Sequence, residues 1–178
     1  MNEKVFNELA SPIYTISQIV VAEALAGKVF QGSSGLLLST AASQQMVMVL
    51  TNPIGSGVRA VLDWISISVK ASALVQQIAV FDGIAAGLSA VSAYNLNTAF
   101  QGDSPACTLA AAGGAGVSLT GGNIISWQYV NVADQSYPCA VVITPGHSFG
   151  MRYVFNSSGN RGTFLFRWYE IPPSGGFA

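Results

Sequence analysis

A series of short runs in which apolar and polar residues alternate, separated by turn residues, restricts the fold of this chain more than any other feature. Alternation places every second side chain on one face of a strand, so each run predicts a half-buried β-strand. The two clearest runs flank the segment NSSGNRG, and we predict that they pair as an antiparallel hairpin. Their alternating residues are Phe149, Met151, Tyr153 and Phe155, then Phe164, Phe166 and Trp168.

Two earlier runs, 44–52 and 58–69, are predicted to be strands joined by a turn. Pro53 has a restricted φ, and Gly55 and Gly57 accept positive φ, which suits a reversal of the chain. The apolar positions of the second run change parity after Trp64, which predicts a β-bulge near Trp64 and Ile65. They are Val58, Ala60, Leu62 and Trp64, then Ile65, Ile67 and Val69.

Further strands are predicted over 73–83, 124–132 and 138–146, with turns at Asp82-Gly83 and Pro145-Gly146. Residues 83–123 are rich in Gly, Ala and Ser, and we expect long loops and one or two short strands there. Many short strands with almost no helix indicate an all-β antiparallel sandwich or barrel over residues 36–178.

Residues 1–35 differ from the rest and are predicted to form an N-terminal arm. Ser11 and Pro12 suit a helix start and Gly27 suits a stop, but the β-branched residues of YTISQIVV also allow an extended arm. The segment FQGSSG has the composition of a linker or tight loop. The first residues lack the pattern of a secretory signal, so we do not expect export by that route. A helical stripe would contain Val5, Leu9, Ile16, Val20 and Ala24.

The chain has too few charges to coat a monomer of this size. Charged residues make up 8% of the sequence, against roughly 25% for an average soluble domain, and the mean hydropathy is +0.47. No run of about 20 apolar residues predicts a membrane span. We therefore expect a surface that is covered by protein, and oligomerisation is the first functional inference. Net charge is −1 and the basic residues are scattered, which disfavours direct nucleic-acid binding.

Two short motifs resemble phosphate-binding or catalytic motifs, but the residues around them do not fit either function. NPIGSGVR has no Lys after its last Gly and leads into a strand, so a phosphate loop is not expected. GHSFG matches G-x-S-x-G with Ser148 as nucleophile, but a strand rather than a helix follows it. His147, the single histidine, is adjacent to that serine, which excludes the usual order of Ser, acid and His. We expect His147 to be exposed or bonded to backbone, and the protein not to be an enzyme.

Metal and cofactor sites are not predicted. One His and two Cys cannot complete a tetrahedral zinc site. Cys107 and Cys139 are interpreted as two buried small residues, although the sequence leaves a disulfide between them open. The acids are isolated; they could bind calcium across loops, but we expect them to form turns. These acids are Asp63, Asp82, Asp103, Asp134 and Glu170.

Four aromatic residues are candidates for either a sugar-binding groove or a subunit interface. Aromatic residues at alternating spacing are usually buried in a core or at a contact between subunits, so we favour the interface. They are Tyr94, Trp127, Tyr129 and Tyr137.

Several segments resemble small structural proteins of tailed bacteriophages, namely capsid decoration (cement) proteins and related head-fibre or tail-fibre domains. The similarity lies in MVLTNPIGSGVRAVLDWISISV, VITPGHSFGMRYVF and GTFLFRWYE, within residues 50–69 and 139–170, with GKVFQGSSG as a third point. Val58 stands where these proteins usually have a Lys after Gly-Ser-Gly. The resemblance implies a jelly-roll domain that forms a homotrimer on the outside of a phage head, bridges major capsid protein subunits, and is made in the host cytoplasm.

The resemblance and the composition together predict a homotrimeric capsid decoration protein whose N-terminal arm grips the shell or a neighbour. The alternative is a fibre or receptor-binding tip domain that recognises a host glycan through surface aromatic residues. A third class, an enzyme acting through Ser148, is the least favoured. No catalytic, cofactor-binding or metal-binding residue is predicted; the expected partners are further copies of the chain and a coat protein, with neither nucleic acid nor membrane.

Overall fold

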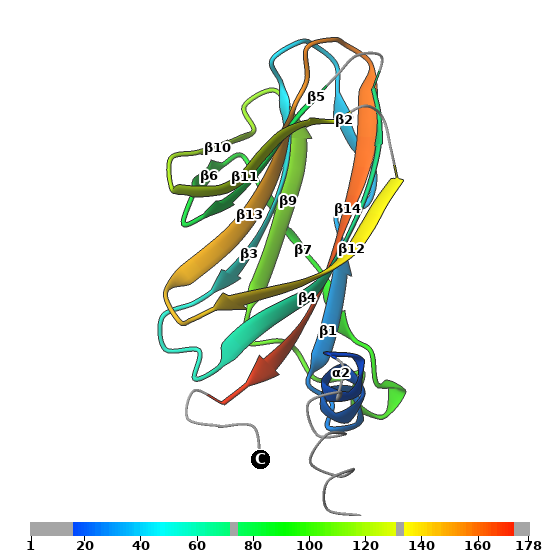
Figure 1. The fold of residues 1–178 in the computed structure, drawn as a ribbon, viewed down its shortest axis with the longest axis vertical. Helices are drawn as coiled ribbons and strands as arrows, with labels where there is room; N and C mark the ends of the chain where they lie inside the picture. Colours follow the sequence, from blue (N-terminus) through cyan, green and yellow to red (C-terminus); the bar gives the residue numbers. More distant parts are fainter. Residues whose placement is uncertain (1–15, 72–74, 131–133, 173–178) are drawn as a thin grey trace, which may run out of the picture.

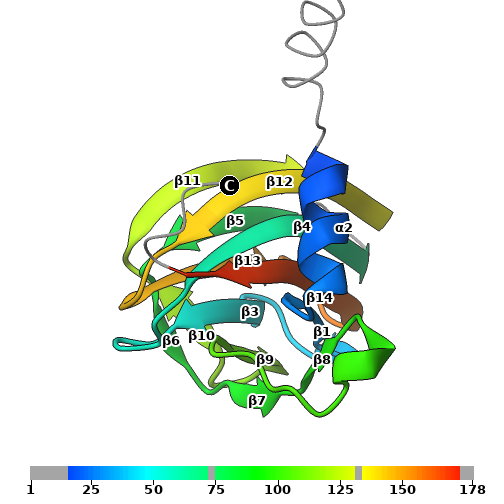
Figure 2. The same ribbon diagram turned by 90° about the horizontal axis from the view of Figure 1, so that it is seen from below.

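The computed structural model describes residues 16–71, 75–130 and 134–172, which form two antiparallel sheets packed face to face (Figures 1 and 2). The predicted antiparallel β-sandwich is confirmed. Consecutive strands alternate between the sheets along much of the chain, which agrees with the jelly-roll-like arrangement that was expected. In sheet A the order is β12 (Asp134–Ile143), β4 (Arg59–Lys70), β14 (Asn160–Ile171), β1 (Val29–Ser33) and β8 (Ala93–Asn95), and β2 (Leu37–Ser39) also pairs with β14.

Sheet B and a small two-stranded sheet complete the sandwich. The middle of the chain contains more strands than the one or two predicted, since five lie between residues 84 and 120. Backbone pairing does not need apolar alternation, and here small residues allow close approach: a Cβ at Gly113 would lie 2.9 Å from the carbonyl oxygen of Leu38. Sheet B has the order β11 (Asn123–Val130), β5 (Val75–Phe81), β13 (His147–Val154), β3 (Gln45–Asn52), β9 (Thr108–Gly114) and β7 (Ser89–Val91), while β6 (Ile84–Ala86) pairs with β10 (Ser118–Thr120) and η2 (Thr98–Phe100) is a short 3-10 helix.

The predicted hairpin between the last two strands is wrong, because β13 belongs to sheet B and β14 to sheet A. Their alternating aromatic residues all lie in the core, as the pattern indicated, but they meet across the sandwich. The ring centroids of Tyr153 and Phe164 are 5.5 Å apart, and those of Phe149 and Phe166 are 5.8 Å apart. Facing strands from opposite sheets fill the core with the same side chains that a hairpin would have placed side by side.

Strand β4 contains the predicted change of parity, but one residue earlier than expected. Trp64 is opposite Arg167 and Leu62 is opposite Trp168, so Asp63 is the extra residue of the bulge. Trp64 therefore lies outside the main core, whereas Leu62 and Ile65 lie within it. The bulge restores the apolar set to the core and places a carboxylate in the middle of a strand.

The segment FQGSSG is not a linker over its first four residues, since they belong to strand β1, which pairs with β14 and β8. The sandwich thus begins at Val29, inside the segment predicted as the arm. Helix α2 (Ile16–Leu25) precedes it and ends where Gly27 predicted, with φ +71°. The N–H groups of Gly27 and Lys28 donate to the carbonyls of Ala24 and Glu23, which closes the helix. Ser11 and Pro12 lie outside the described residues.

The loop between β3 and β4 is a turn, as predicted, and Asn52 holds it in place. Gly55 and Gly57 have φ of +80° and +70°. The buried Asn52 amide donates to the carbonyls of Val58 and Ile143, at 2.9 and 2.8 Å. This side chain joins the end of β3 to the start of β4 and the end of β12. The Asn and Gly residues of NPIGSGV are therefore explained by the structure of the turn.

Candidate functional site

Strand β11 is the most unusual surface of the described chain. It lies at the edge of sheet B, where it pairs with β5 on one side. No described strand pairs with its other side. Seven of its eight residues are exposed, on both faces of the strand. Four are large and apolar, with exposed fractions of 61% for Ile124, 50% for Ile125, 58% for Trp127 and 55% for Tyr129.

The two aromatic residues of β11 lie on the face that points away from the main core. Trp127 is paired with Ile78 and Tyr129 with Gln76, whereas the core residues of β5, Val75 and Ala79, alternate with these partners. The rings of Trp127 and Tyr129 are 5.6 Å apart. The Tyr129 hydroxyl accepts a hydrogen bond from the Gln76 amide at 3.1 Å. The pair is a preformed apolar surface with one polar anchor.

Of the four aromatic candidates, the structure brings together Trp127 and Tyr129. Tyr94 is 69% exposed on β8, at the far edge of sheet A. The side chain of Tyr137 lies outside the described part of the structure. Sequence reasoning missed Ile124 and Ile125, although adjacent isoleucines in a stretch with no charge break the alternation expected of an ordinary half-buried strand.

A second apolar area surrounds the end of helix α2. Val21 and Leu25 are 58% and 73% exposed, and together with Leu96 they border a shallow cavity of about 300 Å³. The Asn97 amide donates to the carbonyls of Ala24 and Leu25, which fixes the end of the helix against the segment that follows β8. These bonds fix the orientation of α2 relative to the sandwich (Figure 1).

His147 and Ser148 are not arranged as a catalytic pair. His147 is exposed, as expected, but its Nδ1 is bonded to the carboxylate of Asp82 at 2.8 Å rather than to backbone. The Ser148 backbone N–H donates to the same carboxylate at 2.9 Å. The bond with His147, followed by the bond from Ser148, lowers the pKa of Asp82. Neighbouring residues of β13 point to opposite faces of the sheet, so His147 is turned away from the Ser148 hydroxyl. The three residues close a turn.

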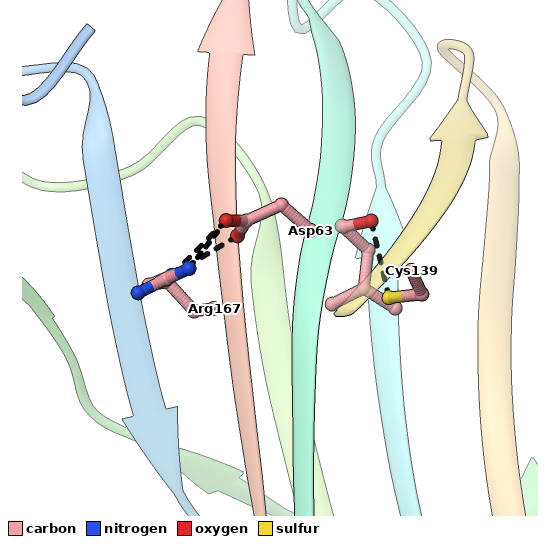
Figure 3. Close-up of polar contacts among 4 residues, drawn as sticks. Asp63, Cys139 and Arg167 are labelled. Carbon is pink, nitrogen blue, oxygen red and sulfur yellow. Dashed lines mark hydrogen bonds and ion pairs between the residues drawn. The ribbon is translucent and has the colours of Figure 1, made fainter. Parts of the chain in front are cut away.

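Asp63 is buried within sheet A, which corrects the prediction that it forms a turn (Figure 3). The Arg167 guanidinium donates to both of its carboxylate oxygens, at distances down to 2.7 Å, and lies 5.5 Å from the ring of Trp64. The Cys139 thiol donates to the carbonyl of Leu62, and burial, followed by the Asp63 charge, raises its pKa to about 12. Cys139 thus stays a protonated thiol near neutral pH.

Glu170 is likewise buried, in β14, and connects this strand to the segment before β9. Its carboxylate accepts hydrogen bonds from the backbone N–H groups of Ala106 and Cys107, each at 2.9 Å, and from the indole N–H of Trp168 at 3.1 Å. Burial, and then the nearby Glu170 charge, raise the pKa of Cys107 well above its ordinary value. Asp134, also predicted to form a turn, begins β12. Asp63 and Glu170 therefore hold strands and loops together.

The described residues contain no cluster of three or more His, Cys, Asp or Glu side chains that could hold a metal ion. Cys107 and Cys139 are both free, so they do not form the disulfide that the sequence left open. A cavity of about 330 Å³ lies beside Glu170 and is also bordered by Lys28 and Asp103. The Glu170 carboxylate is already bonded to three protein donors, so it is not free to hold a ligand there.

No helix in the described ranges is long and apolar enough to span a bilayer. Comparisons with protein-family models, curated protein sequences and solved structures found no match for this chain. The apolar edge strand and the end of helix α2 are therefore interpreted from their own geometry and chemistry.

Proposed function

We propose that this protein is a structural component of a bacteriophage virion, a homotrimeric capsid decoration protein that binds the outside of the head and stabilises the coat lattice. The observation that carries the proposal is the uncharged edge strand β11, which exposes large apolar side chains on both faces. Edge strands of monomeric proteins are usually short, charged or covered. An uncovered one of this composition fits a protein that works as part of an assembly.

The mechanism we propose is mechanical. Burial of apolar surface across the joints between subunits stabilises the assembled shell, by roughly 25 cal/mol per Å² before the costs of association. Several attachment points on one trimer raise the avidity even where each contact is weak. The helix that leaves the sandwich at Gly27, with Val21 and Leu25 exposed, supports a role of the N-terminal segment in gripping the coat.

Co-sedimentation with bare phage heads tests this function. The full chain should saturate the heads, whereas a chain lacking residues 1–15 should remain folded and trimeric but bind them much more weakly. The truncation ends before α2 so that the bonds from the Asn97 amide to the carbonyls of Ala24 and Leu25, which hold the helix against the sandwich, are kept. Equal saturation by both chains would contradict the role of the arm, and no binding by either would contradict the decoration function.

The exposed aromatic pair favours a second function, a fibre or receptor-binding tip that recognises a host glycan. Trp127 and Tyr129 are close together, and Gln76 adds a polar group beside them. Aromatic faces beside hydrogen-bonding groups suit the two sides of a sugar ring. Binding on a glycan array that is lost in Trp127→Ala and kept in Tyr94→Ala would support this second function over the first.

A further inference from the structure

We propose that β11 is where copies of this chain meet, so that three β11 strands converge on the three-fold axis of the homotrimer. This inference rests on the proposed function. It states that β11, the surface on which that function is based, contacts a second copy of the chain and not the coat protein. The observations behind it are the position of the strand, its charge and the area that it exposes.

The position of β11 leaves room for a partner on three sides. The side of β11 that is turned away from β5 has no described strand beside it, and both faces of β11 are exposed. In Figure 2 it lies with β12 along one side of the sandwich, opposite β7. A surface that is open in this way is covered most fully by a contact that runs along the whole strand, as at a symmetry axis.

The charge of β11 favours a contact with its own copies. Near a rotation axis each residue approaches the same residue of another subunit, so any charge there would meet a like charge. No residue between Asn123 and Val130 is charged. Ile124, Trp127 and Tyr129 share one face of the strand, because their partners in β5 lie on the same face of that strand and Ile125 is the extra residue of a bulge. They can therefore pack against their own copies without such repulsion.

The exposed area is of the size that an interface core requires. Aromatic side chains bury roughly 150–250 Å² when fully covered, so the exposed halves of Trp127 and Tyr129 supply about 200 Å² in each copy. With Ile124 and Ile125 the total is about 400 Å², half of the ~800 Å² per partner that stable interfaces bury.

Two edge variants of sheet B provide the first test, by sedimentation velocity with circular dichroism and thermal melting as folding checks. The parent chain should sediment as a trimer of the 18.5 kDa subunit. Trp127→Lys should be folded and reduce the trimer population more than tenfold. Ser89→Lys, on exposed β7 at the opposite edge, should leave the trimer unchanged. A folded Trp127→Lys that stays trimeric would overturn the inference.

Cross-linking tests directly whether β11 meets itself. Gln128→Cys, at an exposed position of β11, should form covalent dimers between chains under mild oxidation, above the background of the parent chain. Ser89→Cys should not. Equal cross-linking by the two variants would overturn the inference even if Trp127→Lys were to weaken the trimer or fail to fold.

Head binding separates failure of this inference from failure of the proposed function. If Trp127→Lys is trimeric but no longer co-sediments with heads, β11 faces the coat protein; the inference is then overturned and the decoration function stands. A monomeric parent chain would overturn the inference together with the trimeric state. Loss of the trimer only in Trp127→Lys, with β11 cross-links in Gln128→Cys, would support the inference.

Discussion

The two edges of sheet B differ sharply. Strand β7 has three residues, Ser89–Val91, with small side chains, and offers little apolar surface for contact with another protein. Strand β11 has eight residues, no charge and four large apolar side chains that are at least half exposed. Short or charged edges prevent unwanted pairing, so β7 has the features of an edge that stays free. The features of β11 suit an edge that is covered.

The edge of sheet A on the same side of the sandwich sharpens this contrast. Strand β12 has ten residues, but it begins with Asp134 and contains Pro138, where its register with β4 becomes irregular. A charge, a proline and an irregularity each oppose edge-to-edge pairing. Strand β11 has a register shift near Ile124 and is regular from Ser126 onward. The contrast predicts that changes on β11 alter assembly, whereas changes in the interior alter folding.

The largest expected effect is on folding and comes from Arg167→Ala. It leaves the Asp63 carboxylate, of which 1% is exposed, without its cation, and we expect the free energy of unfolding to fall by about 3 kcal/mol. Urea denaturation monitored by circular dichroism measures this change. Arg161→Ala, an exposed position of the same strand, is the control and should change stability by less than about 0.5 kcal/mol. Similar losses in both variants would show that the ion pair does not stabilise the fold.

The next effect is on assembly and comes from Tyr129→Ala. Removing an aromatic residue from the centre of an interface costs about 2 kcal/mol, so the dissociation constant of the trimer should rise about 30-fold. The melting temperature of the dissociated chain should not change, because the ring is 55% exposed. Sedimentation equilibrium measures the dissociation constant. Ser89→Ala at an exposed position of β7 is the control, and an equal effect there would remove the distinction between the two edges.

A smaller effect on folding is expected from Glu170→Gln. The amide keeps one acceptor oxygen, so one of the three N–H donors that now reach the carboxylate loses its partner. We expect a loss of about 1–2 kcal/mol in unfolding free energy and faster hydrogen exchange at Ala106 and Cys107. Assembly through β11 should be unaffected. Unchanged exchange at these two amides would contradict the role of Glu170 as the anchor of this segment.

The smallest effect is on the stability of the fold at acid pH. It arises at the turn after β5, the strand that pairs with β11. The bonds from His147 and from the Ser148 N–H lower the pKa of Asp82 in the folded state. The stabilisation is therefore complete above the ordinary pKa of about 4 and is lost as pH falls through the lower folded value. Because the pair is exposed, we expect less than about 1 kcal/mol. Asp82→Asn should remove this part of the acid dependence of the urea midpoint, with Asp103→Asn as the control.

Much of the fold could be predicted from local patterns. The turn at Gly55 and Gly57, the helix end at Gly27 and the buried face of β13 follow from residue preferences that act over a few positions. The pairing of β13 with β14, the strand identity of residues 29–33 and the strands between 84 and 120 were predicted incorrectly. Each depends on contacts between distant segments, or on backbone pairing that small residues do not signal.

The candidate site was predicted in part. Low charge content pointed to a surface that protein covers, and Trp127 and Tyr129 were selected as interface residues. The exposure of Ile124 and Ile125 was missed because two isoleucines in a strand normally indicate burial. The buried positions of Asp63 and Glu170 were also missed, since a carboxylate enters the interior only where partners such as Arg167 or the Ala106 N–H are brought to it.

The sequence by itself determined which residues alternate, where the chain turns and how little charge its surface carries, because these depend on each residue and its near neighbours. The tertiary structure decided which strands pair, which carboxylates are buried and which edge of sheet B remains open. The physical reason is that a two-residue period selects the face of a strand but not its neighbour. Only the packing of both sheets leaves β11, rather than another apolar strand, uncovered.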